Sequence, residues 1–413
     1  MKHCGCHIII YHLFTSTYIS KSAYYAVREK EARKWKTMRQ GKAKYVFPGS
    51  NTPSGFFSFY KEGLKGLERV YILKGGPGTG KSTLMRKIGI AMLERGYDVE
   101  FWQCSSDNDS IDGVIIPGIS LAVIDGTPPH NLDPTYPGAV EEIVNLGDHW
   151  NDEYLRQHRR EIINITENIT ADFDLCYAKL KTALEKRKKW GKYFGSHIDK
   201  EKIDQTTDEL ITQIFYHPSR GARHLFASSV TPRGLISFAD SISRGYDSRY
   251  LLIGPPDCGK ELLMERIAAL AAGRGHNLEI YHNAFVPENI ELIVLPDLSI
   301  AILSLDANCD EVRNETNLHD HIIDCHDFMI KEDSVEIKDD DNDEIDETNN
   351  ESKELAEQFY NEVNEAAEYI ADAKSQHDAL EYYYSKAMDF EAVDIMGNQL
   401  FNKILGIAAS HEK

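Results

Sequence analysis

The stretch Gly75-Gly-Pro-Gly-Thr-Gly-Lys-Ser-Thr83 follows the strand-like run Val70–Lys74 and opens the segment Ser82–Glu94, whose apolar residues recur at helical spacing. It fits the pattern G-x-x-x-x-G-K-[S/T] in the strand, loop and helix context that gives this pattern its meaning. The sequence therefore predicts a Walker A loop that binds Mg-ATP or a related nucleoside triphosphate.

Each part of this loop has a predicted role. Gly75, Gly78 and Gly80 let the backbone wrap phosphate oxygens, and the start of the helix directs its free N–H groups and positive dipole end at them. Lys81 is expected to reach the β- and γ-phosphates, and Ser82 to offer its hydroxyl to Mg²⁺. The predicted nucleotide-binding residues are Gly75, Gly76, Pro77, Gly78, Thr79, Gly80, Lys81, Ser82 and Thr83.

The chain contains a tandem duplication. Shifting the sequence by 179 positions aligns Tyr45–Ile124 with His224–Leu303 without a gap, and about 24 of roughly 80 aligned pairs are identical. Each copy has the pattern strand, glycine-rich turn, helix, strand, which predicts an α/β fold. We expect a duplicated P-loop NTPase fold of three layers around a mainly parallel sheet.

A helical appendage is expected after each copy, because apolar residues recur every three or four positions in 162–184 and 355–384. Packing of each appendage onto its own α/β unit is the favoured arrangement, and a coiled-coil surface for a partner is the alternative. The predicted organisation is an N-terminal extension (1–44), a first P-loop domain (45–215) and a second P-loop-like domain (216–413). Met38 is a candidate for the true start.

Further site candidates follow two predicted strands of the first copy. Asp125 ends the apolar run Leu121–Ile124, which resembles a Walker B strand, and is the second candidate Mg²⁺ ligand; the alternative is a turn-forming Asp-Gly. Because Gly126 and not a glutamate follows Asp125, we expect slow hydrolysis or transfer to another acceptor.

An aspartate-rich loop follows the predicted strand Val99–Gln103. Asp107, Asp109 and Asp112 are candidates for orienting a water or an acceptor hydroxyl, and a polar surface turn is the alternative. His130 is either an acid or base, or a loop cap.

The corresponding loop of the second copy, Gly254–Glu261, is predicted to be degenerate. Pro255 removes a backbone N–H, Asp257 adds a side chain and a negative charge, and Glu261 replaces the hydroxyl of Ser82. We therefore expect a structural or regulatory role, although Glu261 and Asp306 leave an altered metal site as an alternative.

The charge, the cysteines and the hydropathy of the chain argue against several classes of protein. The net charge of −20 argues against general nucleic-acid binding. The segment 331–354 holds twelve acidic residues and three lysines, which predicts a disordered acidic insertion. Seven scattered cysteines indicate reduced thiols, and no run approaches the roughly 20 apolar residues that cross a bilayer, so a cytoplasmic location without membrane contact is expected.

Four motifs together resemble an uncharacterised family of bacterial tandem P-loop ATP-binding proteins. They are Thr52-Pro-x-Gly-Phe-Phe-Ser-Phe59, the loop with its flanks (Leu73–Met85), Cys104–Val114 and Ile124–His130, and the resemblance extends from Met38 to the C-terminus. It implies ATP binding and ATPase or kinase activity. The chain departs from the family pattern at Pro255, Asp257, Glu261 and Asn283–Glu291.

Three functions remain open from the sequence. The first is a slow Mg-dependent ATPase or nucleotide switch with one active and one degenerate site, in which Lys81, Asp125, Asp107 and Asp109 are the catalytic candidates. The second is a small-molecule or nucleotide kinase, with Asp107 or Asp109 as the base. The third is a non-enzymatic assembly protein that ATP stabilises. ATP and Mg²⁺ are the expected ligands, and a protein partner or a homo-oligomer is compatible with the helical appendages.

Overall fold

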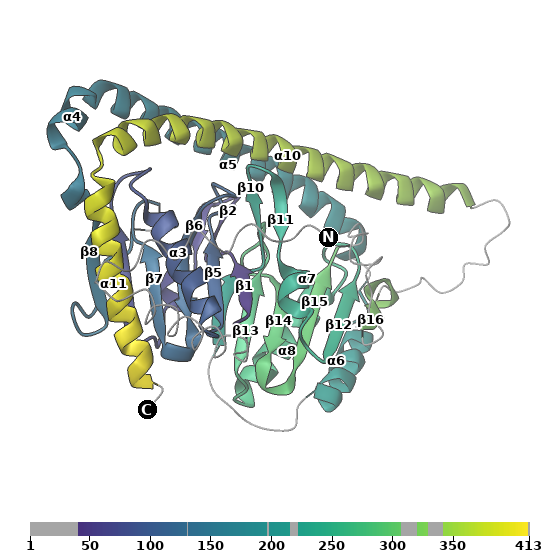
Figure 1. Cartoon of the computed structure of the whole chain (residues 1–413). Helices are drawn as coiled ribbons and strands as arrows, with labels where there is room; N and C mark the ends of the chain where they lie inside the picture. Colours follow the sequence, from purple (N-terminus) through teal and green to yellow (C-terminus); the bar gives the residue numbers. More distant parts are fainter. Residues whose placement is uncertain are drawn as a thin grey trace, which may run out of the picture.

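The computed structural model describes residues 40–129, 131–195, 198–214, 222–306, 320–328 and 342–411. Two six-stranded sheets lie beneath a pair of long helices (Figure 1). Met38, His130 and almost all of the expected N-terminal extension fall outside the described residues. None of the described helices has the length and apolar character that crossing a membrane requires.

The first sheet is mixed but mostly parallel. Only β6 is antiparallel to its neighbours, and the other three strand pairs are parallel. The strands lie in the order β1 (Ala43–Val46), β5 (Val99–Gln103), β6 (Ile111–Ile116), β7 (Leu121–Asp125), β4 (Arg69–Lys74) and β8 (Glu141–Asn145).

The second sheet repeats this order and these directions, with β14 as its one antiparallel strand. Its strands are β9 (Ala222–Phe226), β13 (Leu278–His282), β14 (Ile290–Leu295), β15 (Ile300–Leu305), β12 (Ser248–Ile253) and β16 (Asp320–Asp324). The α/β class and the two mostly parallel sheets are as the sequence predicts for a duplicated unit.

Equivalent residues of the two halves contact each other. Phe47 and Phe226, which are 179 positions apart, exchange backbone hydrogen bonds of 3.1 and 2.9 Å. The hydroxyls of Ser50 and Ser229, also 179 apart, lie 2.8 Å from each other. Contacts between like residues are typical of a two-fold, isologous interface. The surrounding hairpins are β2 (Gly49–Thr52) with β3 (Gly55–Ser58), and β10 (Ser228–Thr231) with β11 (Gly234–Ser237).

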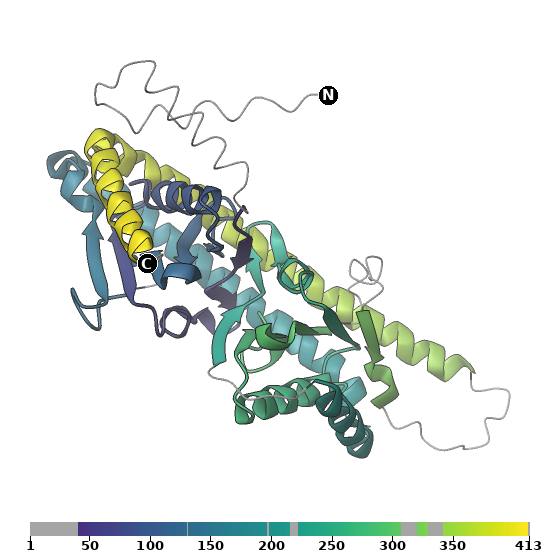
Figure 2. The same ribbon diagram turned by 60° about the horizontal axis from the view of Figure 1, so that its bottom comes forward.

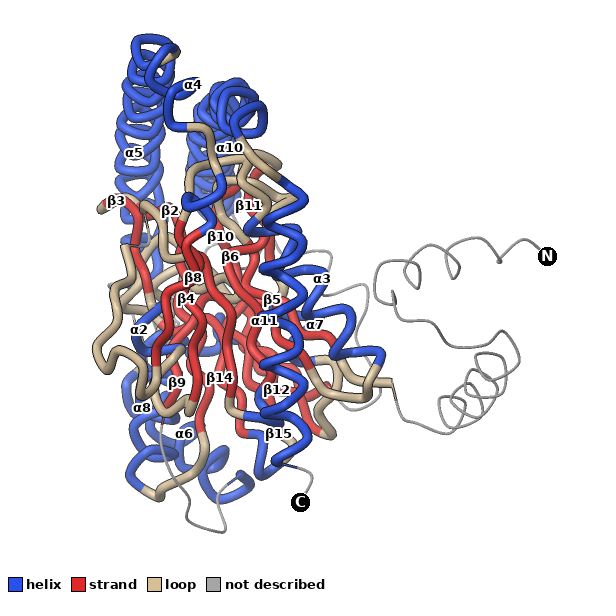
Figure 3. Tube along the Cα trace, turned by 60° about the vertical axis from the view of Figure 1, so that its left-hand side comes forward, coloured by secondary structure: helices blue, strands red, loops and turns tan. Residues whose placement is uncertain are grey.

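Each sheet has one face covered by helices and one face turned to a shared core. Helix α3 (Lys81–Glu94) packs on the first sheet and α8 (Lys260–Gly273) on the second. The opposite faces, including Ile72 of β4 and Leu251 of β12, contribute to one apolar cluster. Figure 3 shows the strands between α3 with α11 on one side and α8 with α6 on the other. In the described residues, this shared core replaces the separate three-layer unit expected for each copy.

The helical appendages are exchanged between the halves. Helix α5 (Arg159–Gly195) leaves the first half and packs against α10 (Asn342–Ala387), which returns from the second. Beyond α5, helix α6 (Lys200–Ile214) packs with α8 through Ile203 and Leu210. Beyond α10, helix α11 (Phe390–His411) packs with α3 through Val393 and Leu400 (Figure 2). The expectation that each appendage packs on its own unit is wrong, because each final helix buries its apolar face on the other half.

The acidic segment 331–354 was expected to be disordered, and this is wrong for 342–354, where the backbone is helical as the start of α10. The helix continues from there into the stretch packed on α5, where Trp190 of α5 donates a 3.1 Å hydrogen bond to Ser352. Residues 331–341 lie outside the described part of the chain. The shorter helices are α2 (Tyr60–Gly63), α4 (Asp152–Gln157) and α7 (Ala239–Ser243), with 3₁₀ turns at Pro117–Ile119, Leu146–His149, Pro296–Leu298 and Cys325–Phe328.

Candidate functional site

Residues 75–82, the first loop, connect the carboxyl end of β4 to the start of α3. Gly75, Gly78 and Gly80 have φ angles of 154°, 67° and 94°, which L side chains rarely adopt. Helix α3 begins at Lys81 directly after Gly80, so its first N–H groups lie at the loop. The backbone therefore has the turn that the glycine spacing predicts.

Lys81 and Asp125 come together beside the first loop. The Lys81 Nζ donates to the carbonyls of Gly75 and Gly76 at 3.0 and 2.7 Å, and it lies 3.6 Å from Asp125 Oδ2. Strands β4 and β7 are parallel neighbours, with Leu73 opposite Asp125. The other oxygen of Asp125 accepts from the backbone N–H and the hydroxyl of Thr127 at 2.8 and 2.6 Å. Asp125 therefore both caps the turn at Gly126–Thr127 and lies next to the lysine.

Four further residues of the predicted binding set have distinct surroundings. The Ser82 hydroxyl accepts a 3.0 Å hydrogen bond from the Ile111 N–H, which orients it toward the start of β6. The Thr79 hydroxyl donates to the Gly76 carbonyl at 2.8 Å and so holds the loop from inside. Thr83 is exposed, and Pro77 is partly buried.

The aspartates after β5 separate from one another. Asp107 lies 3.7 Å from Lys374 of α10, whereas Asp109 points outward and forms a bidentate pair of 2.8 and 2.9 Å with Arg233 of the second half. Asp112 is buried in β6. Of the two catalytic candidates in this loop, Asp107 and Asp109, only Asp107 faces the helix that covers the first loop.

Helix α10 lies directly against the first loop. Ser385 donates a 3.1 Å hydrogen bond to the Gly78 carbonyl. A Cβ added to Gly76 would lie 2.4 Å from the ring of Tyr384, and one added to Gly78 would lie 2.7 Å from Ser385 Oγ. Close approach of α10 therefore favours glycine at both positions, and Gly78 has a positive φ in addition.

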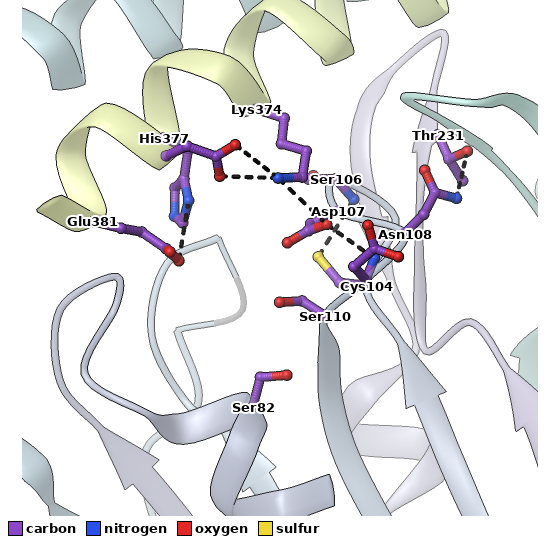
Figure 4. Close-up of polar contacts among 12 residues, drawn as sticks. Ser82, Cys104, Ser106, Asp107, Asn108, Ser110, Thr231, Lys374, His377 and Glu381 are labelled. Carbon is purple, nitrogen blue, oxygen red and sulfur yellow. Dashed lines mark hydrogen bonds and ion pairs between the residues drawn. The ribbon is translucent and has the colours of Figure 1, made fainter. Parts of the chain in front are cut away.

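The same helix turns further polar side chains toward the loop. Figure 4 shows Lys374, His377 and Glu381 of α10 on one side and Ser82 on the other, with Asp107 between them. The His377 ring lies 3.7 Å from Glu381. Sequence reasoning missed these residues, because nothing local in the chain links positions near 380 to a loop near 78. The one available signal was the helical spacing of Lys374, His377, Glu381 and Ser385.

Residues 254–261, the second loop, have a similar backbone but different chemistry. Gly259 has φ 102° and precedes α8, which begins at Lys260, and Asp257 has φ 60° where the first loop has Gly78. Gly191 of α5 packs on Asp257 so closely that an added Cβ would lie 2.1 Å from its carboxylate. Asp257 occupies a left-handed conformation that aspartate tolerates better than most residues.

An internal ion-pair cluster fills the centre of the second loop. Lys260 is 1% exposed, and its Nζ lies 2.7 Å from Asp306 Oδ1. The Arg187 guanidinium of α5 donates to the other oxygen of Asp306 at 2.5 Å. Although burial raises the pKa of Asp306, the charges of Arg187 and Lys260 hold it well below its usual value.

Glu261 also binds the backbone of the second loop. It accepts a 3.1 Å hydrogen bond from the Asp257 N–H, and burial raises its pKa. Both oxygens of Asp306 are taken by cations, which argues against the altered metal site. Within the described ranges, no group of three or more His, Cys, Asp or Glu is arranged to hold a metal ion.

Comparisons of this chain with protein-family models, curated proteins and solved structures find no match.

Proposed function

We propose that the chain binds a Mg-nucleoside triphosphate, ATP in the first instance, at the first loop and acts as a slow hydrolase or nucleotide switch. The observation that carries the proposal is Lys81. Its side chain is only 8% exposed beside a glycine-rich turn, its two hydrogen-bond partners there are neutral loop carbonyls, and its nearest carboxylate, Asp125, is 3.6 Å away. A buried cation gains more from an anion than from neutral dipoles.

The neighbouring donors suit the expected ligand. Backbone N–H groups at the start of α3 and the Lys81 ammonium would hold the phosphates. The Ser82 hydroxyl and the Asp125 carboxylate are oxygen donors of the kind that Mg²⁺ prefers. Bound Mg²⁺ would neutralise phosphate charge, and Asp125 already lies within ion-pair distance of Lys81.

Two features favour a slow switch over a fast hydrolase or a kinase. Asp125 is followed by Gly126, so no glutamate from this strand end reaches an attacking water. Helix α10 covers Gly76 and Gly78, which leaves less room for an acceptor substrate and puts a long helix where it can respond to nucleotide. Asp107, which lies 3.7 Å from Lys374 of this helix, is the candidate for orienting water.

The test is release of ADP from Mg-ATP by the purified chain without an added acceptor. Slow ADP release that Lys81→Met abolishes supports the proposal, and Asp257→Asn in the exposed tip of the second loop serves as the matched control with unchanged release. ADP release that occurs only when an acceptor is added would indicate a kinase instead. Binding of ATP without any release would make it a switch or an assembly protein.

A further inference from the structure

The side of the first loop that faces α10 carries a cation from the other half of the chain. Lys374 lies 3.7 Å from Asp107 and 2.9 and 3.0 Å from the two oxygens of Asp378 on its own helix. About a quarter of its side chain is exposed. Such partly exposed ion pairs contribute little to stability, so Lys374 can exchange its partners at small cost.

The position of Lys374 relates it to the nucleotide site. It stands on the face of α10 that seven residues later carries Glu381, whose backbone oxygen would lie 2.9 Å from a Cβ on Gly78. In Figure 4, Lys374 lies on the α10 side of Asp107 and Ser82 lies on the side of the first loop. The four-carbon side chain of Lys374 can rotate away from Asp107 toward the first loop.

Other cations near the first loop have backbone carbonyls among their partners. Lys74 donates to two backbone carbonyls and to Asp133. Arg86 donates to the Asp109 carbonyl. Lys374 differs because the partners the structure gives it are carboxylates, one of which belongs to the loop after β5.

In the second half, a cation from the other half's long helix is already paired with an anion beside the loop. There the long helix α5 supplies Arg187 to Asp306, the anion that neutralises the loop lysine Lys260. In each half, therefore, the long helix that arrives from the other half lies on the loop and carries a cation. The first half lacks an internal anion as close to its loop lysine, since Asp125 is 3.6 Å from Lys81.

We propose that Lys374 completes the first site by binding the terminal phosphate of the triphosphate, in place of Asp107 and Asp378. This inference rests on the proposed function. A triphosphate carries an anionic group that a diphosphate lacks, so Lys374 makes the site prefer ATP to ADP. Helix α10 then carries the difference between the two states to α5, and hence to the second half.

The test compares dissociation constants for Mg-ATP and Mg-ADP in the full chain and in Lys374→Met. The ATP constant should rise about tenfold or more, as expected for loss of a charge-assisted hydrogen bond, whereas the ADP constant should change less than about twofold. Lys386→Met is the matched control, because Lys386 is an exposed lysine of the same helix whose Nζ lies over the Tyr382 ring. Lys374→Arg keeps the charge and should keep the preference for ATP.

Each other outcome has a definite meaning. If Lys374→Met weakens the binding of ATP and ADP equally, or weakens neither, the role of Lys374 is overturned. The proposed function still stands in that case, provided that nucleotide binding depends on Lys81. Absence of nucleotide binding in the unmodified chain, or binding that survives Lys81→Met, overturns both. Thermal unfolding without nucleotide should be the same for Lys374→Met and the unmodified chain, which excludes a general loss of structure.

Discussion

The two loops have closely related backbones and opposite electrostatic arrangements. Both place a glycine with positive φ directly before a helix that begins with a buried lysine. Both lysines donate to backbone carbonyls, but Lys81 lies 3.6 Å from its nearest carboxylate, Asp125, whereas Lys260 lies 2.7 Å from Asp306. Asp306 is in turn paired with Arg187. The comparison teaches that a carboxylate of the chain can supply the anion that such a loop would otherwise take from a ligand.

Among the variants that test this difference between the loops, the largest expected effect is a loss of folding stability in the second loop. Asp306→Asn leaves Lys260 and Arg187 buried, with side-chain exposures of 1% and 7%, without their shared counter-charge. Removing one member of a buried pair costs about 3 kcal/mol or more. Chemical denaturation at neutral pH should show this loss.

The matched change in the first half is Asp125→Asn. Its amide oxygen can still accept from Thr127, its ion pair with Lys81 is long at 3.6 Å, and Lys81 keeps its two carbonyl partners, so the cost should be smaller than that of Asp306→Asn. Equal losses in the two variants would contradict the distinction between an internally neutralised loop and one that awaits a ligand.

A smaller, pH-dependent effect is expected at Glu291, the residue that corresponds to Asp112 in the repeat. Burial raises its pKa from 4.5 to about 7, against the opposing hydrogen bond from Ser228. Because the folded-state pKa is raised, the native state is favoured below pH 4.5 and loses that advantage as pH rises through 7. Glu291→Gln should therefore stabilise the fold at pH 8 by on the order of 2 kcal/mol and have little effect at pH 4.5.

Denaturation curves of Glu291→Gln and the unmodified chain at the two pH values check this prediction. Glu291→Gln keeps an oxygen that can accept from Ser228, so packing is conserved. A stabilisation of the same size at both pH values would show that the effect does not come from titration of this carboxyl.

The smallest effect is expected at the surface, where Asp109 pairs with Arg233. Both side chains are more than half exposed, so Asp109→Asn should change stability by roughly 0.5 kcal/mol or less. It should also leave ADP release unchanged, because its carboxylate faces Arg233 and not the first loop. Asp107→Asn is the comparison, and a larger loss of ADP release from Asp109→Asn than from Asp107→Asn would restore Asp109 as the better catalytic candidate.

The local parts of the fold could be predicted from sequence, whereas the long-range parts could not. The identity pattern at a shift of 179 residues predicted two equivalent sheets, and the glycine spacing predicted the turn before Lys81. The exchange of α6 and α11 could not be predicted, because apolar periodicity shows that a helix has a buried face and not which surface buries it. The contact of Ser385 with Gly78, 307 positions away, has no local signal either.

The second loop shows the same limit. The substitutions Asp257 and Glu261 predicted that this loop had lost the chemistry of the first loop. Arg187, however, belongs to the basic run Lys186–Lys189, and a run of this kind usually forms a solvated face. Its role emerges only where α5 meets Asp306. Residues that act through contacts between the halves are therefore the ones that sequence patterns leave out.

The most direct test of the central claim is the stoichiometry of Mg-ATP binding, measured by titration calorimetry on the full chain and on Lys81→Met. We predict one site per chain, with affinity at least about a hundredfold weaker in Lys81→Met and unchanged in Asp257→Asn. Two sites per chain, or one site that survives Lys81→Met, would contradict the account of a ligand-binding first loop and an internally neutralised second loop.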